Sequence, residues 1–253
     1  DNTAQTSTYS GTQVEITAPT ISSESGVTIS VLPKYSYAVQ GSSGFTDNLP
    51  ANAGTYTVRA SVAESDNLAA AHADMTLTIS KAPLTIASAT VASKPYDAAK
   101  TATVSGVTFT GLVNGETLAP GEDYTASGEF ADANAGTGKS VTVTVVLTSA
   151  KANNYNLTNG SVNATGTITK ADSSITKAPT ATGITYGQAL SDSALTNGEG
   201  SVAGAFTWAD GTIKPNAGTA QFSVTFTPND TNYNAATADV SVTIAKATPT
   251  LTA

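Results

Sequence analysis

The chain contains several segments in which every second residue is hydrophobic and the intervening residues are mostly Thr and Ser. A period of two places alternate side chains on opposite faces of a β-strand, so one face can be buried while the other meets water. The pattern therefore predicts half-buried strands. The alternating hydrophobic sets are Tyr56, Val58, Ala60 and Val62; Val141, Val143, Val145 and Leu147; and Phe222, Val224 and Phe226.

A second alternating segment follows each of these strands after an Asn-centred break, which predicts a turn or loop tip. The breaks are Asp66-Asn67-Leu68, Asn153-Asn154-Tyr155 and Thr231-Asn232-Tyr233. The second segments are Met75-Leu77-Ile79, Ala164-Gly166-Ile168 and Val240-Val242-Ile244, and each is followed by Lys-Ala, at 81–82, 170–171 and 246–247. The same landmarks thus recur three times in the same order.

The tetrapeptide Asn-Ala-Gly-Thr precedes each first strand. Its glycines are 82 residues apart in both intervals (136 − 54 and 218 − 136). Because Gly tolerates positive φ and Asn bonds to neighbouring backbone, we interpret the motif as a structural turn that leads into a strand. The predicted turn residues are Asn52, Gly54, Asn134, Gly136, Asn216 and Gly218.

This period predicts an all-β chain of three tandem small modules, residues 1–81, 82–171 and 172–247, with residues 248–253 starting a further repeat. We expect immunoglobulin-like β-sandwich modules in an extended array, each closing its own modest hydrophobic interior. The alternative is a grasp-like, mostly-β module with one short helix, for which residues 190–195 are the favoured place. Asn114-Gly115 also predicts a tight hairpin turn.

Composition narrows the function classes. The net charge is −8 and Arg59 is the single arginine, which disfavours nucleic acid as a partner. The chain has no Cys, so disulfides and thiolate chemistry are excluded. No apolar run reaches the roughly 18 residues of a spanning helix, so we expect no membrane insertion in this segment. The N-terminus also lacks the charged-then-apolar pattern of a signal peptide, so we expect either a cytosolic chain or one whose targeting ends were removed.

Candidate catalytic groups are sparse. His72 is the one histidine, and no strained nucleophile turn accompanies it, so a Ser-His-Asp site is disfavoured. Glu116, Glu122, Asp123 and Glu129 form the densest acidic group, but a small module offers little of the apolar cleft that raises a carboxyl pKa. We therefore predict no enzymatic activity, no catalytic residue and no cofactor-binding residue.

Two further groups of residues have alternative interpretations. The oxygen-rich segments 229–232 and 132–134 could hold calcium between modules, although their spacing differs from an EF-hand; we otherwise expect no cofactor and no metal site. Phe206 and Trp208 alternate on one strand face and are expected in the core rather than on a sugar-binding surface. Tyr37, Tyr96 and Tyr186 recur early in the modules and are likewise expected in the core, where they would pack or bond near a module end.

The second module resembles the YDG-type repeat of bacterial surface proteins. The resemblance lies in Lys94-Pro95-Tyr96-Asp97, Gly111-Leu112-Val113-Asn114-Gly115, Phe130-Ala131-Asp132 and Asn154-Tyr155-Asn156-Leu157, with Ala98 where the family often has Gly. The third module, with Ile184-Thr185-Tyr186-Gly187-Gln188 and Phe206-Thr207-Trp208, resembles the related MBG-type repeat, and the first module is similar to a divergent copy. The resemblance implies tandem immunoglobulin-like or grasp-like modules and transfers no catalytic residue.

From this resemblance we expect a non-catalytic stalk or adhesin-like segment of a protein at the surface or wall of a bacterium. Such a segment would space or present a binding region for host or matrix glycoprotein or polysaccharide, with neighbouring repeats of the same chain as further partners. The alternative is a set of accessory modules of a secreted carbohydrate-active enzyme. A wall-sorting signal with more repeats would favour the first function, and a catalytic domain in the same protein would favour the second.

Overall fold

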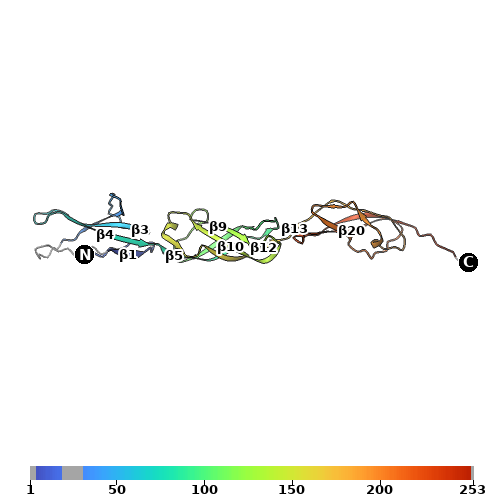
Figure 1. Cartoon of the computed structure of the whole chain (residues 1–253), viewed down its shortest axis with the longest axis horizontal. Helices are drawn as coiled ribbons and strands as arrows, with labels where there is room; N and C mark the ends of the chain where they lie inside the picture. The colour runs from blue at the N-terminus through green and yellow to red at the C-terminus, as the bar shows by residue number, and fades with distance from the viewer. Residues whose placement is uncertain (1–3, 19–30, 252–253) are drawn as a thin grey trace. The chain divides into compact units, whose positions relative to one another are not determined.

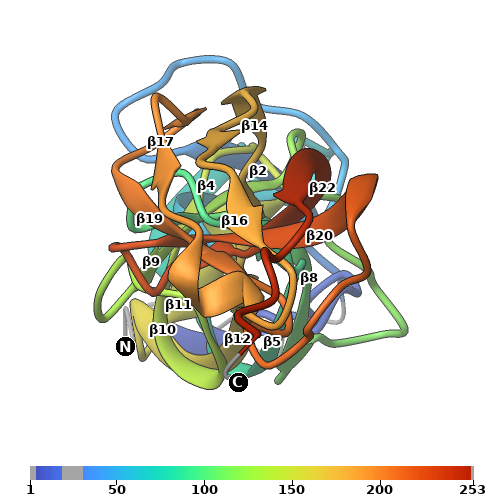
Figure 2. The same cartoon turned by 90° about the vertical axis from the view of Figure 1, so that its right-hand side faces the viewer.

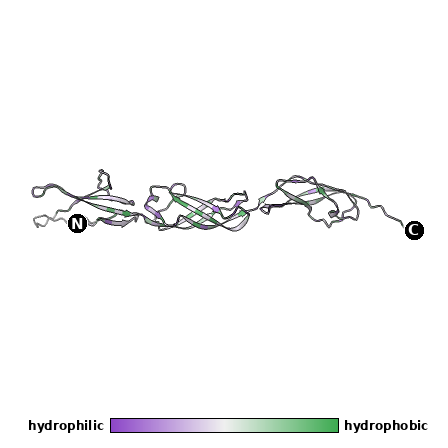
Figure 3. Cartoon of the chain, viewed as in Figure 1, coloured by the Kyte–Doolittle hydropathy of each residue, from purple (hydrophilic) through white to green (hydrophobic). Residues whose placement is uncertain are grey.

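The structure is a computed structural model that describes residues 4–18 and 31–251 (Figure 1). Its regular elements are β-strands and two short 3-10 helices, η1 (Ala152–Asn154) and η2 (Leu190–Asp192). The predicted all-β class is confirmed. In the described ranges no helix is long and apolar enough to cross a membrane. The hydrophobic residues, green in Figure 3, are concentrated on the strands, as the alternating pattern predicted.

The first sheet has four strands in the order β1-β4-β3-β2. Its strands are β1 (Gln5–Thr8), β2 (Lys34–Val39), β3 (Gly54–Val62) and β4 (Ala71–Ser80). Strands β3 and β4 are antiparallel and pair Gly54 with Ile79 and Val62 with Ala71. Their alternation places Val58 and Leu77 in the interior, where both are 0 % exposed. The two predicted strands of the first repeat are therefore confirmed.

Residues 82–169 form two further sheets, with strand orders β11-β5-β8 and β6-β12-β10-β9-β7. Val141 and Val143 are fully buried, at 0 % exposed, as the alternation predicted. The strands are β5 (Ala82–Val91), β6 (Lys94–Pro95), β7 (Thr101–Ala102), β8 (Val104–Thr110), β9 (Tyr124–Phe130), β10 (Gly136–Leu147), β11 (Tyr155–Leu157) and β12 (Ser161–Thr169).

The last part of the chain contains a four-stranded sheet with the order β16-β22-β20-β19 and three two-stranded ladders, β13-β21, β14-β18 and β15-β17. Figure 2 shows strands β16, β20 and β22 of this sheet from the end of the chain's longest axis. The strands are β13 (Ala171–Asp172), β14 (Ile175–Lys177), β15 (Thr180–Ala181), β16 (Ile184–Thr185), β17 (Leu195–Thr196), β18 (Glu199–Gly200), β19 (Gly204–Trp208), β20 (Gly218–Pro228), β21 (Tyr233–Asn234) and β22 (Ala236–Ala245).

A short parallel edge strand recurs in three sheets. It is β1 against β4, β6 against β12 and β16 against β22. The residue that follows each edge strand is a tyrosine whose backbone N–H donates to the closing strand: Tyr9 to Ser80, Tyr96 to Thr169 and Tyr186 to Ala245. The equivalent of Tyr96 and Tyr186 is therefore Tyr9, so the prediction that grouped Tyr37 with them was wrong. Tyr37 lies within β2 and is buried in the core.

Contacts divide the chain into two compact units. One comprises residues 1–91, 104–128 and 142–164, and the other comprises residues 92–103, 129–141 and 165–253. The residues of β9, β10 and β12 are divided between the two. Each unit contains residues from both sides of one predicted module boundary, after residue 81 or after residue 171, so the three module ranges stay predictions.

The hydrophobic core of the first unit continues across the predicted boundary after residue 81. One cluster of buried residues joins Val58 and Leu77 from the first repeat to Ala82, Leu84 and Tyr155 from the second. The prediction that each copy closes its own interior was therefore wrong here, because β5 and β11 supply hydrophobic side chains to the end of the first repeat. In the second unit, Ile184, Leu190, Val242 and Ile244 form a separate cluster.

Three local predictions can be compared with the structure. Asn114 and Gly115 form a tight turn with φ of 51° and 70°, but the flanking residues are irregular rather than a hairpin. The predicted helix at 190–195 is a 3-10 helix limited to Leu190–Asp192. Trp208 packs against the cluster around Leu190, and its indole N–H donates to the Ser193 carbonyl at 2.9 Å, as expected of a core aromatic residue.

Candidate functional site

The three Asn-Ala-Gly turns each lead into a long strand. Gly54, Gly136 and Gly218 are the first residues of β3, β10 and β20. Of these three glycines, Gly218 alone has positive φ, at 136°, so the left-handed backbone proposed as the reason for Gly applies at one copy. The assignment of the motif as a structural turn stays a prediction. The structure adds contacts that involve the Asn and Ala of the motif.

The first turn binds a buried asparagine from the next repeat. Asn154 is 4 % exposed and lies at the end of η1, immediately before β11. Its side-chain oxygen accepts the backbone N–H of Ala53 at 2.8 Å. Its side-chain nitrogen donates to the Asn52 side-chain oxygen at 3.0 Å. One amide thus satisfies a backbone donor and a side-chain acceptor of the turn that starts β3.

The second turn repeats this arrangement with different residues. Asn232 is 8 % exposed, and its side-chain oxygen accepts the backbone N–H of Ala135 at 2.8 Å. Its side-chain nitrogen donates to the Asn134 side-chain oxygen at 3.2 Å. The pairing of donors and acceptors is identical to that of Asn154 with residues 52 and 53. The Asn of the loop and the Asn-Ala of the preceding turn therefore form a repeated two-bond contact, which we call the asparagine latch.

A tyrosine pair accompanies each latch. Tyr155 follows Asn154 and meets Tyr9 edge to face, with ring centroids 5.5 Å apart and an interplanar angle of 83°. Tyr233 follows Asn232 and meets Tyr96 at 5.6 Å and 81°. Edge-to-face pairs at this separation contribute about 0.5–1.5 kcal/mol beyond the area that they bury. The tyrosines that follow β1 and β6 are thus the receiving halves of these aromatic contacts.

Backbone pairing completes each junction. Strand β11 runs parallel to β5 and pairs Tyr155 with Ala82, while β21 runs parallel to β13 and pairs Tyr233 with Ala171. Ala82 and Ala171 belong to the Lys-Ala pairs that mark the predicted module boundaries. The boundary segment is therefore a strand that pairs with the Asn-Tyr loop, rather than a free linker. Sequence analysis identified both segments but did not join them.

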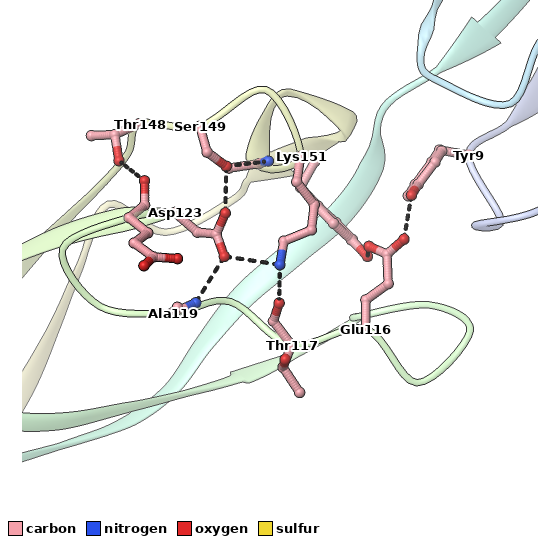
Figure 4. A network of polar contacts seen from close by, with 11 residues as sticks. Tyr9, Glu116, Thr117, Ala119, Asp123, Thr148, Ser149 and Lys151 are labelled. Atoms are coloured by element: carbon pink, nitrogen blue, oxygen red, sulfur yellow. Dashed lines mark hydrogen bonds and ion pairs between the residues drawn. The ribbon is translucent and has the colours of Figure 1, made fainter.

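A carboxylate links the two rings at the first junction, and Figure 4 shows its contact with Tyr9. Glu116 accepts hydrogen bonds from the hydroxyl groups of Tyr9 and of Tyr155, the latter at 2.6 Å. Burial, the larger cause, and the hydrogen bond to Glu116, the second cause, raise the pKa of both tyrosines to about 12. Both hydroxyls therefore stay protonated at neutral pH and act as donors. At the second junction the hydroxyl oxygen of Tyr96 lies 3.5 Å from a carboxylate oxygen of Asp230.

Asp123 organises the loop beside this carboxylate (Figure 4). The Ser149 hydroxyl donates to Asp123 at 2.6 Å, the Ala119 N–H donates at 2.9 Å, and the Lys151 ammonium lies 2.9 Å away. These hydrogen bonds, that of Ser149 first, lower the pKa of Asp123 to about 2. Asp123 is therefore ionised and fully engaged in holding the segment that precedes η1.

The candidate catalytic groups lie on different strands and loops. His72 lies exposed on β4, opposite Ser61 in the ladder. Glu129 lies on β9, and Glu116 and Asp123 are engaged as described. The predicted calcium segments do meet at the second junction, but through the latch, with the Asp230 carboxylate accepting the Asn232 N–H. Within the described ranges no group of three or more His, Asp or Glu side chains is arranged to hold a metal ion.

The side-chain roles of Asn154 and Asn232 were missed by the sequence analysis, which placed both at loop tips. The available signal was the Asn-Tyr pair shared by the second and third repeats, at 154–155 and 232–233. An asparagine that served only to form a turn would not need to be followed by a tyrosine in both repeats, so the repeated pair indicated a further role.

Comparison with solved structures finds multi-domain β proteins. They include Sidekick-1 immunoglobulin domains 1–5, with 13 % identity and a TM-score of 0.27, covering 85 % of this chain and 53 % of that one. Drosophila N-cadherin EC1–3 has 8 % identity and a TM-score of 0.27, covering 98 % and 99 %. Three N-terminal domains of the bacteriophage RB49 Hoc protein have 14 % identity and a TM-score of 0.27, covering 85 % and 89 %. The chain spans about half the length of the Sidekick-1 fragment.

Family comparison is more specific, although no curated protein gave a significant match. An MBG domain model matches residues 1–92, and a YDG domain model matches residues 80–164. Strand β5 lies in the overlap of the two matches, in agreement with its place at the first junction. The MBG-type resemblance of residues 172–247 stays a prediction. The chain therefore carries an MBG domain followed by a YDG domain, which confirms the resemblance for these two regions.

Proposed function

We propose that the chain is a non-catalytic spacer segment of a bacterial cell-surface protein, adhesin-like in role, which presents a binding region for host or matrix glycoprotein or polysaccharide. The MBG and YDG matches support the class of protein. The observation that carries the proposal is the asparagine latch, because the same two-bond contact occurs at Asn154 and at Asn232. A spacer needs such contacts, since a chain joined only by flexible linkers cannot hold its ends apart.

Each junction combines three interactions that resist bending. The latch contributes two hydrogen bonds, each with a net value of about 0.5–1.5 kcal/mol. The tyrosine pair adds an apolar contact, and the parallel ladder fixes the boundary residues in the backbone network of the next repeat. Because these interactions differ in kind and act at the same place, neighbouring repeats are expected to move together rather than swivel about the Lys-Ala pair.

Small-angle X-ray scattering of the whole chain tests the spacer role. A compact domain of this length has a radius of gyration of about 18 Å, whereas three units in line, on the order of 100 Å long, would have about 29 Å. We expect a value near the larger figure. We also expect Asn154→Ala with Asn232→Ala to broaden the distance distribution, whereas the exposed pair Asn153→Ala with Asn229→Ala leaves it unchanged. A radius near the smaller figure would contradict the proposal.

The binding part of the proposal needs a separate measurement. A glycan array and a panel of matrix glycoproteins, probed with the purified chain, would identify direct ligands. Binding would assign presentation to these repeats themselves. A chain that scatters as an extended spacer but binds none of these ligands would restrict its role to spacing.

A further inference from the structure

The last repeat carries a third copy of the surface that receives a latch. Tyr186 follows β16 as Tyr9 follows β1, with the same backbone bond to the closing strand. Tyr186 is nevertheless 55 % exposed, against 6 % for Tyr9. Ala217 of the third turn and Ala247 of the third Lys-Ala pair are also exposed. The residues that receive a loop at the first two junctions are thus uncovered at the third.

These exposed residues line one open hollow. It has a volume of about 460 Å³ and is bounded by Tyr186, Ala217 and residues 246–249. At the second junction, the corresponding turn residue Ala135 and boundary residue Lys170 also line one hollow, together with Asn234 from the following repeat. The hollow beside Tyr186 shares the turn Ala and the boundary Lys with the hollow at the second junction, and it additionally includes the tyrosine. We call it the terminal acceptor face.

We propose that the terminal acceptor face binds the Asn-Tyr loop of a further repeat of the MBG or YDG type. In this complex the loop asparagine accepts the Ala217 N–H and donates to the Asn216 side chain. The loop tyrosine packs edge to face on Tyr186, and this tyrosine and the residue after it pair in parallel with residues 247 and 248, in the register of the two occupied junctions. This proposal rests on the geometry of the two occupied junctions and does not depend on the location or binding role proposed above.

The chemistry of the face favours such a loop over other occupants. It offers one backbone donor, one amide acceptor and an aromatic edge in the arrangement that Asn154-Tyr155 and Asn232-Tyr233 already satisfy. A second copy of this chain would present Asn67-Leu68, in which Leu68 occupies the tyrosine position. A further repeat with Asn-Tyr therefore matches the face better than a second copy does.

An extended chain tests the proposal directly. Residues 172–251 are appended a second time after Ala247, so that the new junction has the sequence of the second one. Tyr186→Phe in the appended copy leaves one Tyr186 to be followed. Nitration by tetranitromethane is then mapped by peptide mass spectrometry, with Tyr96 as the covered reference. Amide hydrogen exchange at Ala217 provides a second measurement that does not depend on tyrosine chemistry.

We expect the appended repeat to reduce nitration of Tyr186 to the level of Tyr96 and to slow exchange at Ala217. Asn232→Ala in the appended copy should restore both, whereas Asn229→Ala in that copy should not. If Tyr186 is nitrated and the Ala217 amide exchanges at the same rates in the original and the extended chains, the proposal is overturned. Protection of Tyr186 in the original chain that increases with protein concentration would identify a second copy as the occupant and would also overturn it.

Discussion

The asparagine latch makes a quantitative prediction at Asn232. Asn232→Ala removes two hydrogen bonds, of 2.8 Å and 3.2 Å, and leaves the Ala135 N–H without its acceptor. The two bonds together have a net value of about 1–3 kcal/mol, and a buried unsatisfied donor adds about 1–3 kcal/mol. Since Asn232 is 8 % exposed, water can compensate for part of this loss. We therefore expect a loss of roughly 2–4 kcal/mol.

Trp208 is the single tryptophan and belongs to the same unit as Asn232, so its fluorescence reports the relevant transition. Denaturant unfolding of the wild type and of Asn232→Ala, compared at constant slope, gives the difference in the free energy of unfolding. Asn229→Ala is the matched control, because Asn229 is an exposed asparagine of the same loop. Adding Asn134→Ala completes a double-mutant cycle, in which we expect the two losses to be less than additive.

The reasoning would be refuted if Asn232→Ala changed the free energy of unfolding by no more than the roughly 0.5 kcal/mol typical of surface substitutions. A loss of the expected size with fully additive cycle energies would contradict the bond between the Asn232 and Asn134 side chains and would assign the whole effect to the Ala135 N–H.

Three further predictions concern the tyrosine pair, the aspartate beside it and a close-packed glycine. The pKa values of Tyr9 and Tyr155 are raised to about 12, so the contribution of the two hydroxyls to the free energy of unfolding is fully present below the unfolded value of 10.0 and is lost as pH rises toward 12. The double variant Tyr9→Phe with Tyr155→Phe should therefore lose less stability than the wild type at alkaline pH, as measured by denaturant titration. The pKa of Asp123 is lowered to about 2, so the contribution of its carboxylate to the free energy of unfolding is present above pH 3.8 and is lost as pH falls through 2. Asp123→Asn should therefore destabilise the protein at pH 7 and have little effect near pH 2, and equal effects at both pH values would contradict the assignment. At Gly200 an added Cβ would lie 2.1 Å from the Phe226 ring, so Gly200→Ala should lower the free energy of unfolding by about 1–3 kcal/mol through overpacking. The control Gly160→Ala, whose added Cβ would have no heavy atom within 4 Å, should be close to neutral when the unfolding of both variants is followed by circular dichroism.

Local pattern was sufficient for the strands. The alternation around Val58, Val143 and Val224 predicted β3, β10 and β20, because a period of two is imposed by the pleat of each strand and needs no knowledge of the partner. The Lys-Ala pairs likewise marked the ends of the closing strands β4, β12 and β22, each of which stops at the residue before the Lys. The family resemblance of residues 1–164 followed from the same short motifs.

Tertiary structure alone decided what those segments contact. The latch joins Ala53 to Asn154 and Ala135 to Asn232, which are 101 and 97 residues apart in the chain, and no local period encodes a partner at that distance. For the same reason Tyr9 rather than Tyr37 proved equivalent to Tyr96, since equivalence was set by the parallel edge strand and not by position in the repeat. The core likewise continued beyond residue 81, because burial depends on which strands pair, and β5 pairs with β11 of the same repeat, which brings Tyr155 to the core of the first repeat.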